Sequence, residues 1–294
     1  MYLIFTEDDG WHTSQLIKSF EKNKKKVVTA KINNSSIVLE DIPKIIIDTK
    51  EYFLREIEGA FVRGIPGGTL EEVIFHLDIL HYLELYNVCV YNNTLCIEKS
   101  VDKIRTSSIL KANNIPTPKT YITSNIKDLN KFKKKFFKKK CVSKPIFGSQ
   151  GKGLEILDEN NIHPNYESLN NVYYLQEYLD HPEKKYIDWR LFVIKNKVIA
   201  SMVREGKTWI NNVANGASCK FFNPSIEMEE MAIKASNALN MDYSGVDIML
   251  SDSGYMVTEV NSIPAWKGLQ SVHNDRIIAD EIIKNFLTLC EEKN

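Results

Sequence analysis

Short apolar runs alternate with amphipathic segments along the first hundred residues. The runs lie at residues 2–5, 27–30, 45–47 and 61–62. This alternation predicts an open α/β sheet with helices packed on its strands. The clearest helix is predicted to begin at a capping box formed by Thr69 and Glu72. Its apolar residues recur on one helical face: Leu70, Val73, Ile74, Leu77 and Leu80.

Arg63 and a group of glycines connect the last of these runs to that helix. Gly64, Gly67 and Gly68 keep side chains away from the predicted helix N-terminus, where free amides and the helix dipole favour an anion. The same residues, with Pro66, are equally typical of a tight strand-to-helix turn. Both interpretations stand, and the charge of Arg63 slightly favours substrate contact.

A glycine-rich hairpin is predicted in the middle of the chain. One strand ends at Lys144, the loop is spaced by Gly148, Gly151 and Gly153, and a second strand follows. The spacing matches neither a P-loop nor a dinucleotide-binding fold. The hairpin is therefore either an ordinary structural loop or a flap that folds over a phosphate chain, with Lys144 neutralising charge.

A lysine-rich run precedes this hairpin. It extends from Lys131 to Lys140 and overlaps the end of a helix predicted at residues 126–137. Lysines at a helix C-terminus complement the dipole and stay solvated, and this interpretation is favoured over a nucleic-acid patch.

The last third of the chain begins with an antiparallel pair of strands that turns at Asn196 and Lys197. Asp188, Arg190 and Arg204 lie near the strand ends. The arginines could pair with nearby carboxylates or grip phosphate through their fork geometry, and the residues support both equally. The Asn- and Gly-rich loop at 206–218 has no apolar period, so we expect it to be exposed and to cover a site.

The stretch at residues 244–266 predicts a β-hairpin that carries three oxygen-bearing side chains. If its turn centres on Ser253, Asp247 and Glu259 lie opposite each other, and Asn261 points the same way as Glu259. Two facing carboxylates repel unless a cation lies between them. Oxygen ligands suit a hard ion such as Mg²⁺, so the hairpin predicts a metal site.

Composition narrows the class of protein. Lys plus Arg and Asp plus Glu both number 38, so net charge indicates neither nucleic acid nor a membrane surface as a partner. The 294 residues, 43% of them hydrophobic, favour two or three subdomains. Five scattered cysteines without a C-x-x-C pair, no signal sequence and no long apolar run predict a reduced, cytoplasmic protein.

The order of these motifs resembles the ATP-grasp superfamily, in its branch of RimK-like α-L-glutamate ligases. The resemblance covers nearly the whole chain, including a preceding α/β domain, and rests on motifs that follow one another in this order: Asp102-Lys103, Lys144, G-S-Q-G-K-G, Q-E-Y-L, D-W-R, Arg204, S-G-V-D and T-E-V-N-S-I-P. It implies an N-terminal open α/β domain at residues 1–97, then a two-lobed α+β ATP-grasp fold. Its central lobe would span 98–180 and its C-terminal lobe 181–294.

The resemblance also implies roles for individual residues. Lys103 and Lys144 would contact the nucleotide phosphates. The loop that closes on ATP would comprise Gly148, Ser149, Gln150, Gly151 and Gly153. The adenine would lie against Gln176, Glu177, Tyr178 and Leu179, with Asp188 near the ribose. The ligands of two Mg²⁺ ions, which Mn²⁺ could replace, would be Asp247, Glu259 and Asn261, with Glu259 bridging. The triphosphate and acyl phosphate would be bordered by Arg190, Arg204 and Asn212. Ile210 stands where relatives often have a basic residue, which leaves substrate contacts in that loop open.

The implied activity is ATP-dependent ligation through an acyl phosphate, with Lys144 and Arg204 as catalytic residues and no side-chain nucleophile. Its substrates would be L-glutamate and a carboxylate acceptor, with neither a membrane nor nucleic acid as a partner. Known acceptors in the family are a tetrahydromethanopterin-type coenzyme, a deazaflavin coenzyme and a ribosomal protein C-terminus, and the segment from Arg63 to His81 resembles the first group. The alternatives are a noncatalytic ATP-binding protein and an RNA- or ribosome-associated protein. Self-association is left open.

Overall fold

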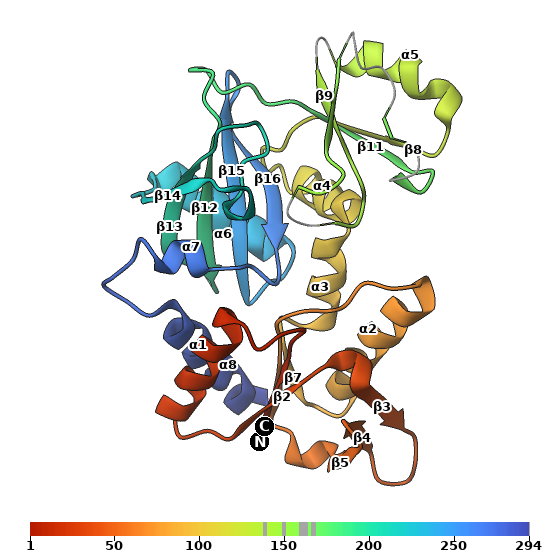
Figure 1. Cartoon of the computed structure of the whole chain (residues 1–294), viewed down its shortest axis with the longest axis vertical. Coiled ribbons are helices and arrows are strands. Elements are labelled where there is room, and N and C mark those ends of the chain that lie inside the picture. The colour runs from red at the N-terminus through yellow and green to blue at the C-terminus, as the bar shows by residue number, and fades with distance from the viewer. Residues whose placement is uncertain (138–139, 149–150, 159–163, 166–168, 294) are drawn as a thin grey trace. The chain divides into compact units, whose positions relative to one another are not determined.

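The computed structural model describes residues 1–137, 140–148, 151–158, 164–165 and 169–293 (Figure 1). The chain forms two compact units. The first unit contains Met1–Ile97, Met241–Tyr243 and Ser262–Asn294, and the second contains Glu98–Asn240 and Ser244–Asn261. The chain thus returns to the first unit twice after leaving it. The division into three consecutive segments at residues 97 and 180 stays a prediction.

A four-stranded parallel sheet forms the centre of the first unit, in the order β2-β1-β6-β7. Its strands are β1 (Tyr2–Phe5), β2 (Val27–Ala30), β6 (Gly59–Val62) and β7 (Cys89–Tyr91). The helices of this unit are α1 (Trp11–Lys22), α2 (Leu70–Leu85), the short α7 (Lys267–Gln270) and α8 (Ile278–Lys293). The predicted open α/β sheet is confirmed for three of the four apolar runs. The run at 45–47 instead lies in a separate antiparallel sheet of β3 (Ser35–Val38), β4 (Lys44–Ile47) and β5 (Lys50–Phe53).

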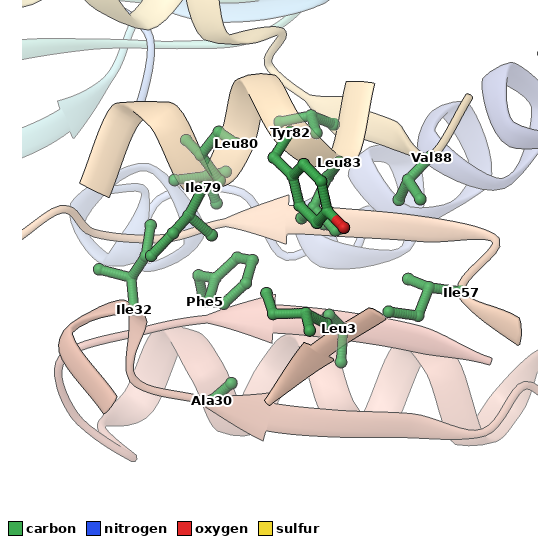
Figure 2. Packing of buried hydrophobic residues seen from close by; sticks show 14 of the residues in the cluster. Leu3, Phe5, Ala30, Ile32, Ile57, Ile79, Leu80, Tyr82, Leu83 and Val88 are labelled. Atoms are coloured by element: carbon green, nitrogen blue, oxygen red, sulfur yellow. The ribbon is translucent and has the colours of Figure 1, made fainter. Parts of the chain in front are cut away.

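Both faces of the parallel sheet are covered, which explains why its strands are apolar throughout. Leu3 and Phe5 point to one face, where they pack below Ile79, Leu80 and Leu83 of α2 (Figure 2). Successive side chains alternate between the faces of a strand. On the other face an aromatic cluster therefore joins the sheet to α1 and α8: Tyr2, Phe20, Phe61 and Phe286.

Helix α2 has the predicted capping box but buries a different stripe from the predicted one. Thr69 Oγ1 accepts from the Glu72 amide, and Glu72 Oε2 accepts from the Thr69 amide. The side chains that are buried in α2 are His76, Ile79, Leu80, Tyr82 and Leu83. Leu70 and Ile74 are 71% and 47% exposed. The expectation was wrong because α2 carries apolar residues nearly all the way round, so spacing alone does not select the stripe that meets the sheet.

Two antiparallel sheets make up most of the second unit. The first has the order β10-β9-β11-β8, with β8 (Thr120–Thr123), β9 (Cys141–Lys144), β10 (Glu155–Leu157) and β11 (Tyr173–Glu177). The second has the order β14-β13-β12-β15-β16, with β12 (Ile187–Ile194), β13 (Lys197–Glu205), β14 (Ser218–Phe221), β15 (Tyr243–Ser251) and β16 (Gly254–Asn261). The helices are α3 (Thr94–Val101), which crosses from the first unit, α4 (Lys103–Ala112), α5 (Ile126–Phe136) and α6 (Ile226–Ala238).

Three strand pairs predicted in this unit are confirmed. β9 and β10 form the hairpin around the glycines, β12 and β13 form the antiparallel pair, and β15 and β16 form the carboxylate hairpin. The turn between β12 and β13 lies at Lys195 and Asn196, one residue earlier than expected. Within the described ranges, no helix is both long and apolar enough to cross a membrane. The cytoplasmic location stays a prediction.

Candidate active site

A cavity of about 400 Å³ lies in the second unit, bordered by both antiparallel sheets and by α4. Many of the predicted site residues line it: Lys103, Lys144, Gly148, Gly151, Gln176, Glu177, Tyr178, Leu179, Asp188 and Glu259. The predicted residues of the second unit that do not border it directly are Gly153, Arg190, Arg204, Asn212, Asp247 and Asn261. Ser149 and Gln150 lie outside the described residues. The structure therefore brings the predicted phosphate, adenine and ribose residues to one cavity, while their individual roles stay predictions.

Lys144 ends β9 at the wall of this cavity. Its Nζ donates to Gln176 Oε1 at 2.6 Å. Burial lowers the pKa of Lys144 to about 8, while the negative charge of Glu259 opposes the shift and Lys103 adds to it. An anion placed in the cavity would favour the charged form, so the lysine is suited to bind phosphate.

Lys103 begins α4 next to its N-cap Asp102, whose carboxylate accepts from the amides of the first helical turn. The Nζ of Lys103 donates to the carbonyl oxygens of Ile146 and Gly148, each at 3.1 Å. Burial lowers the pKa of Lys103, and Glu259 opposes that shift. This lysine therefore contacts the start of the glycine loop as well as the cavity.

The glycine loop requires backbone conformations that other residues rarely adopt. Gly148, Gly151 and Gly153 have φ of 152°, 77° and 73°. A Cβ on Gly153 would also lie 3.2 Å from Pro145 Cγ. The glycines are thus needed for the path of the loop, whichever of the two functions predicted for it applies.

The segment from Gln176 to Leu179 lines the cavity as β11 ends. Its backbone is hydrogen-bonded on both sides, because the Glu177 amide donates to the Lys119 carbonyl at 2.8 Å and the Tyr178 amide donates to the Lys140 carbonyl at 3.5 Å. The rings of Tyr178 and Trp209 approach to 6.3 Å, and Lys140 Nζ lies 5.0 Å from the Tyr178 ring centre. Aromatic faces at the cavity wall suit stacking against a purine base.

A chain of four charged side chains lies on β12, β13 and β15. Arg204 donates to Asp188 at 2.6 and 2.8 Å and lies 3.1 Å from Asp247. Arg190 donates to both oxygens of Asp247 at 2.7 Å. The structure thus shows the arginines in two-point pairs with carboxylates, one of the two arrangements that the sequence left open.

Burial shifts the two carboxylates of this chain differently. It raises the pKa of Asp188 to about 6, with Arg204 opposing the rise. Burial would also raise the pKa of Asp247, but Arg190 and Arg204 together outweigh it and lower that pKa. Asp247, with two arginine partners, is therefore held as a carboxylate.

The hairpin of β15 and β16 places Asp247 directly opposite Glu259, as predicted, although by a different route. Ser251 pairs with Gly254, so the turn is only Asp252 and Ser253. The register shifts beyond Asp247, leaving Thr258 as an extra residue in β16. This β-bulge restores the predicted opposition.

The donors on this hairpin fit a hard cation in kind. A carboxylate has about four lone-pair positions, and the arginines Arg190 and Arg204 make three contacts with those of Asp247. About one position is then left for a metal ion. Glu259 borders the cavity, and Asn261 Nδ2 donates to the Gly245 carbonyl at 3.3 Å, which leaves its side-chain oxygen directed elsewhere. Among the described residues, no group of three His, Cys, Asp or Glu side chains could hold a metal ion. A site here would therefore draw on Asn261 or on substrate oxygens in addition to the two carboxylates.

Several residues that border the cavity were not predicted from the sequence, and two of them belong to the Asn- and Gly-rich loop. Trp209 and Asn211 border the cavity from the Asn- and Gly-rich loop. Asn211 Nδ2 donates to the Arg204 carbonyl at 2.9 Å, while its Oδ1 is buried without a hydrogen-bond partner in the described structure. The available signal was a tryptophan in a loop that has no apolar period. Asn212, which was predicted instead, lies next to the cavity residue in sequence but does not border the cavity.

Arg63 belongs to the first unit and is engaged within it. Its guanidinium lies 5.2 Å from the centre of the Trp266 ring, and burial lowers the pKa of Arg63. Nη1 also lies 3.5 and 3.4 Å from the carbonyls of Ile263 and Pro264. Through these contacts Arg63 stabilises the segment that follows the carboxylate hairpin. The substrate contact predicted for Arg63 stays a prediction.

Comparisons with known proteins agree with this fold. Residues 100–286 match the family described as the RimK-like ATP-grasp domain. The chain is 32% identical to a tetrahydromethanopterin:alpha-L-glutamate ligase of Methanococcus maripaludis, covering 98% of both chains, and 34% identical to the enzyme of that name from Methanocaldococcus jannaschii, covering 97% of both. The structure of the ATP-grasp ligase PsnB with its minimal precursor has a TM-score of 0.74 at 15% identity, covering 98% of this chain and 97% of that one.

The fold and the matched residues together define an ATP-grasp ligase, an enzyme that joins a carboxylate to an amine at the expense of ATP. Within that class, the chain belongs to the RimK-like family. The predicted fold class and family are confirmed.

Proposed function

We propose that this enzyme adds L-glutamate to a tetrahydromethanopterin-type coenzyme through an acyl phosphate. The observation that carries the proposal is the similarity, over nearly all of both chains, to two ligases named for that acceptor. The cavity supports the nucleotide half of the reaction, because it combines two lysines, a glycine loop and an aromatic segment.

The reaction has two steps. The acceptor carboxylate attacks the γ-phosphorus of ATP, which forms an acyl phosphate and releases ADP. The amine of glutamate then attacks the acyl carbon, phosphate leaves, and the amine loses a proton as the amide forms. An acyl phosphate is hydrolysed by water, so exclusion of water matters more than a nucleophilic side chain.

In this proposal Lys103 and Lys144 bind the phosphates and stabilise the charge that develops during transfer. The glycine loop folds over the phosphates, and Tyr178 with Trp209 borders the base. Two Mg²⁺ ions, replaceable by Mn²⁺, would be held by Asp247, Glu259 and Asn261 and would neutralise phosphate oxygens. These residue assignments rest on matched motifs and on proximity to the cavity.

The arginines have a narrower role in this proposal than the sequence alone indicated. Arg190 and Arg204 hold Asp247, and Arg204 also holds Asp188 at the cavity wall. We assign Arg204 to catalysis mainly through the position and charge of these carboxylates, and direct contact of either arginine or Asn212 with the triphosphate stays a prediction. Glutamate and the acceptor are the proposed substrates; nucleic acid has no part in the reaction.

The decisive test incubates purified protein with ATP, Mg²⁺, L-glutamate and each candidate acceptor in turn. We expect ADP, phosphate and a product heavier by one glutamyl residue with tetrahydromethanopterin, and none with a deazaflavin coenzyme or a ribosomal C-terminal peptide. If the acceptor carboxylate carries heavy oxygen, the label should appear in phosphate. AMP and pyrophosphate as products would refute the acyl phosphate, and ligation only to another acceptor would refute the substrate. Glu259→Gln is the matched inactive control.

A further inference from the structure

Gln176 is a buried polar side chain at the centre of a hydrogen-bonded network beneath the cavity. It is 3% exposed. Its Oε1 accepts from Lys144 Nζ at 2.6 Å, and its Nε2 donates to Tyr174 OH at 2.9 Å and to Thr120 Oγ1 at 3.3 Å. Tyr174 OH also lies 2.7 Å from Ser107 Oγ of α4. Every polar atom of the amide is therefore engaged.

Strand register explains why these residues meet. β11 lies between β9 and β8, and Gln176 pairs with Thr120 on β8 while Tyr174 pairs with Lys144 on β9. Tyr174 and Gln176 are two residues apart, so their side chains emerge from the same face of the sheet. Lys144 reaches Gln176 along the diagonal of this antiparallel pair.

The chemistry of the lysine determines the orientation of the amide. An ammonium group only donates hydrogen bonds, so the atom facing Lys144 must be the amide oxygen. The amide nitrogen must then face the two hydroxyls, both of which can accept. Reversal would place two donors against each other at Lys144 and leave Gln176 without its shortest contact.

We propose that Gln176 is a positioning residue that holds the Lys144 ammonium at the phosphate end of the cavity, and that it does not read the adenine base. The inference rests on the proposed nucleotide site and revises the sequence-based assignment of Gln176 to the base. A neutral acceptor orients the lysine without neutralising the charge that phosphate needs. A carboxylate at this position would pair with the lysine and compete with phosphate.

An apolar residue at position 176 would leave a buried ammonium without its partner. Burial already lowers the pKa of Lys144 to about 8, and Glu259 of β16 and Lys103 of α4 are the charged groups that act on it. A lysine in such surroundings depends on each hydrogen bond for its position and charge. Loss of Gln176 Oε1 should therefore weaken phosphate binding and leave contacts with the base unchanged.

The test compares ADP with adenosine as ligands of the full chain, by calorimetry for ADP and by saturation-transfer NMR for adenosine. Gln176→Met should weaken ADP binding about tenfold or more, as expected for loss of a hydrogen bond to a charged group. Adenosine affinity should change less than about twofold. The matched control Thr120→Val removes only the longest contact of the amide and should change ADP affinity less than about threefold. An equal loss for ADP and adenosine in Gln176→Met would overturn the inference.

A second comparison tests whether Gln176 acts through Lys144. Once Lys144→Met has removed the ammonium, adding Gln176→Met should reduce ADP affinity no further, because coupled residues are not additive. Additive losses would contradict the inference. Gln176→Glu, which retains an acceptor and the shape of the side chain, should also lower ADP affinity selectively; it decides the question if Gln176→Met does not fold.

The outcome is separable from that of the proposed function. Glutamate ligation could fail with every acceptor while these binding results hold, and only the proposed function would then fall. If the parent protein ligates glutamate normally and Gln176→Met binds ADP as tightly as the parent, only the inference about Gln176 would fall. No ADP binding by the parent protein would overturn both.

Discussion

Removal of Arg204 should destabilise the second unit in a pH-dependent way. Arg204 is 4% exposed and is paired with Asp188 and Asp247, which are 8% and 5% exposed. In Arg204→Met, Asp247 keeps both hydrogen bonds from Arg190, but Asp188 loses the two that the structure shows from Arg204. The main effect of the variant is therefore that the buried carboxylate of Asp188 loses the positively charged partner that the structure shows.

Loss of one partner from a buried ion pair typically costs about 3–5 kcal/mol. The remaining contacts of Asp247 place the expected loss for Arg204→Met near the lower end, about 3 kcal/mol at pH 8. The sign with pH follows from Asp188. Burial raises its pKa to about 6, above the 3.8 of the free group, and without Arg204 the pKa rises further. As pH falls, Asp188 in the folded variant binds a proton at a higher pH than in the unfolded chain. The loss of stability caused by Arg204→Met should therefore shrink between pH 8 and pH 5.

Urea unfolding, followed by tryptophan fluorescence to which Trp189 and Trp209 of the second unit contribute, measures the change in the free energy of unfolding. The control Asp188→Asn removes the carboxylate, and the double variant with Arg204→Met should recover about half or more of the loss at pH 8. A loss below about 1 kcal/mol at pH 8 would contradict the buried-charge argument. So would a loss that is equal at pH 8 and pH 5.

Three further changes test other parts of the structure. Asn92→Ala removes four hydrogen bonds between a fully buried amide and backbone groups, so thermal unfolding should show a loss of about 3 kcal/mol or more; an unchanged midpoint would contradict this. When ADP binds near pH 8, the protein should take up a fraction of a proton, because the phosphates favour the charged form of Lys144. The calorimetric binding enthalpy should therefore depend on the buffer in the parent protein but not in Lys144→Met. Gly153→Ala should weaken ATP binding or lower stability by about 1 kcal/mol, because the backbone φ at this position is 73°. Gly67→Ala should change neither property, because nothing lies within 4 Å of the added Cβ. Equal effects of the two alanines would refute the backbone argument.

Local rules predicted much of what surrounds the cavity. Alternation identified the strands, and the positions of Lys144 and of the glycines identified the hairpin of β9 and β10. The opposition of Asp247 and Glu259 was also predicted correctly, although the bulge at Thr258 could not be. A bulge changes pairing by one residue without a consistent sequence signal, and here it offset an error of one residue in the turn.

Contacts between residues that lie far apart in the sequence could not be predicted from local patterns. Arg190 and Arg204 had several carboxylates within reach along the chain, and only the packing of β12, β13 and β15 selects Asp188 and Asp247. The role of Gln176 depends on the register of three strands, which local pattern does not determine. For the same reason, the return of residues 241–243 and 262–294 to the first unit had no signature in composition or periodicity.

The carboxylate hairpin was expected to need a cation because two acidic residues face each other. The structure offers a different source of positive charge, since Arg190 and Arg204 lower the pKa of Asp247 and hold both of its oxygens. Asp247 is therefore held in position by protein side chains alone. Glu259 borders the cavity and stands opposite this fixed carboxylate. If the proposed Mg²⁺ ions bind here, a ligand set with one member already immobilised would lose less conformational freedom on binding, and the affinity would depend mainly on Glu259 and on the phosphates that share the ion.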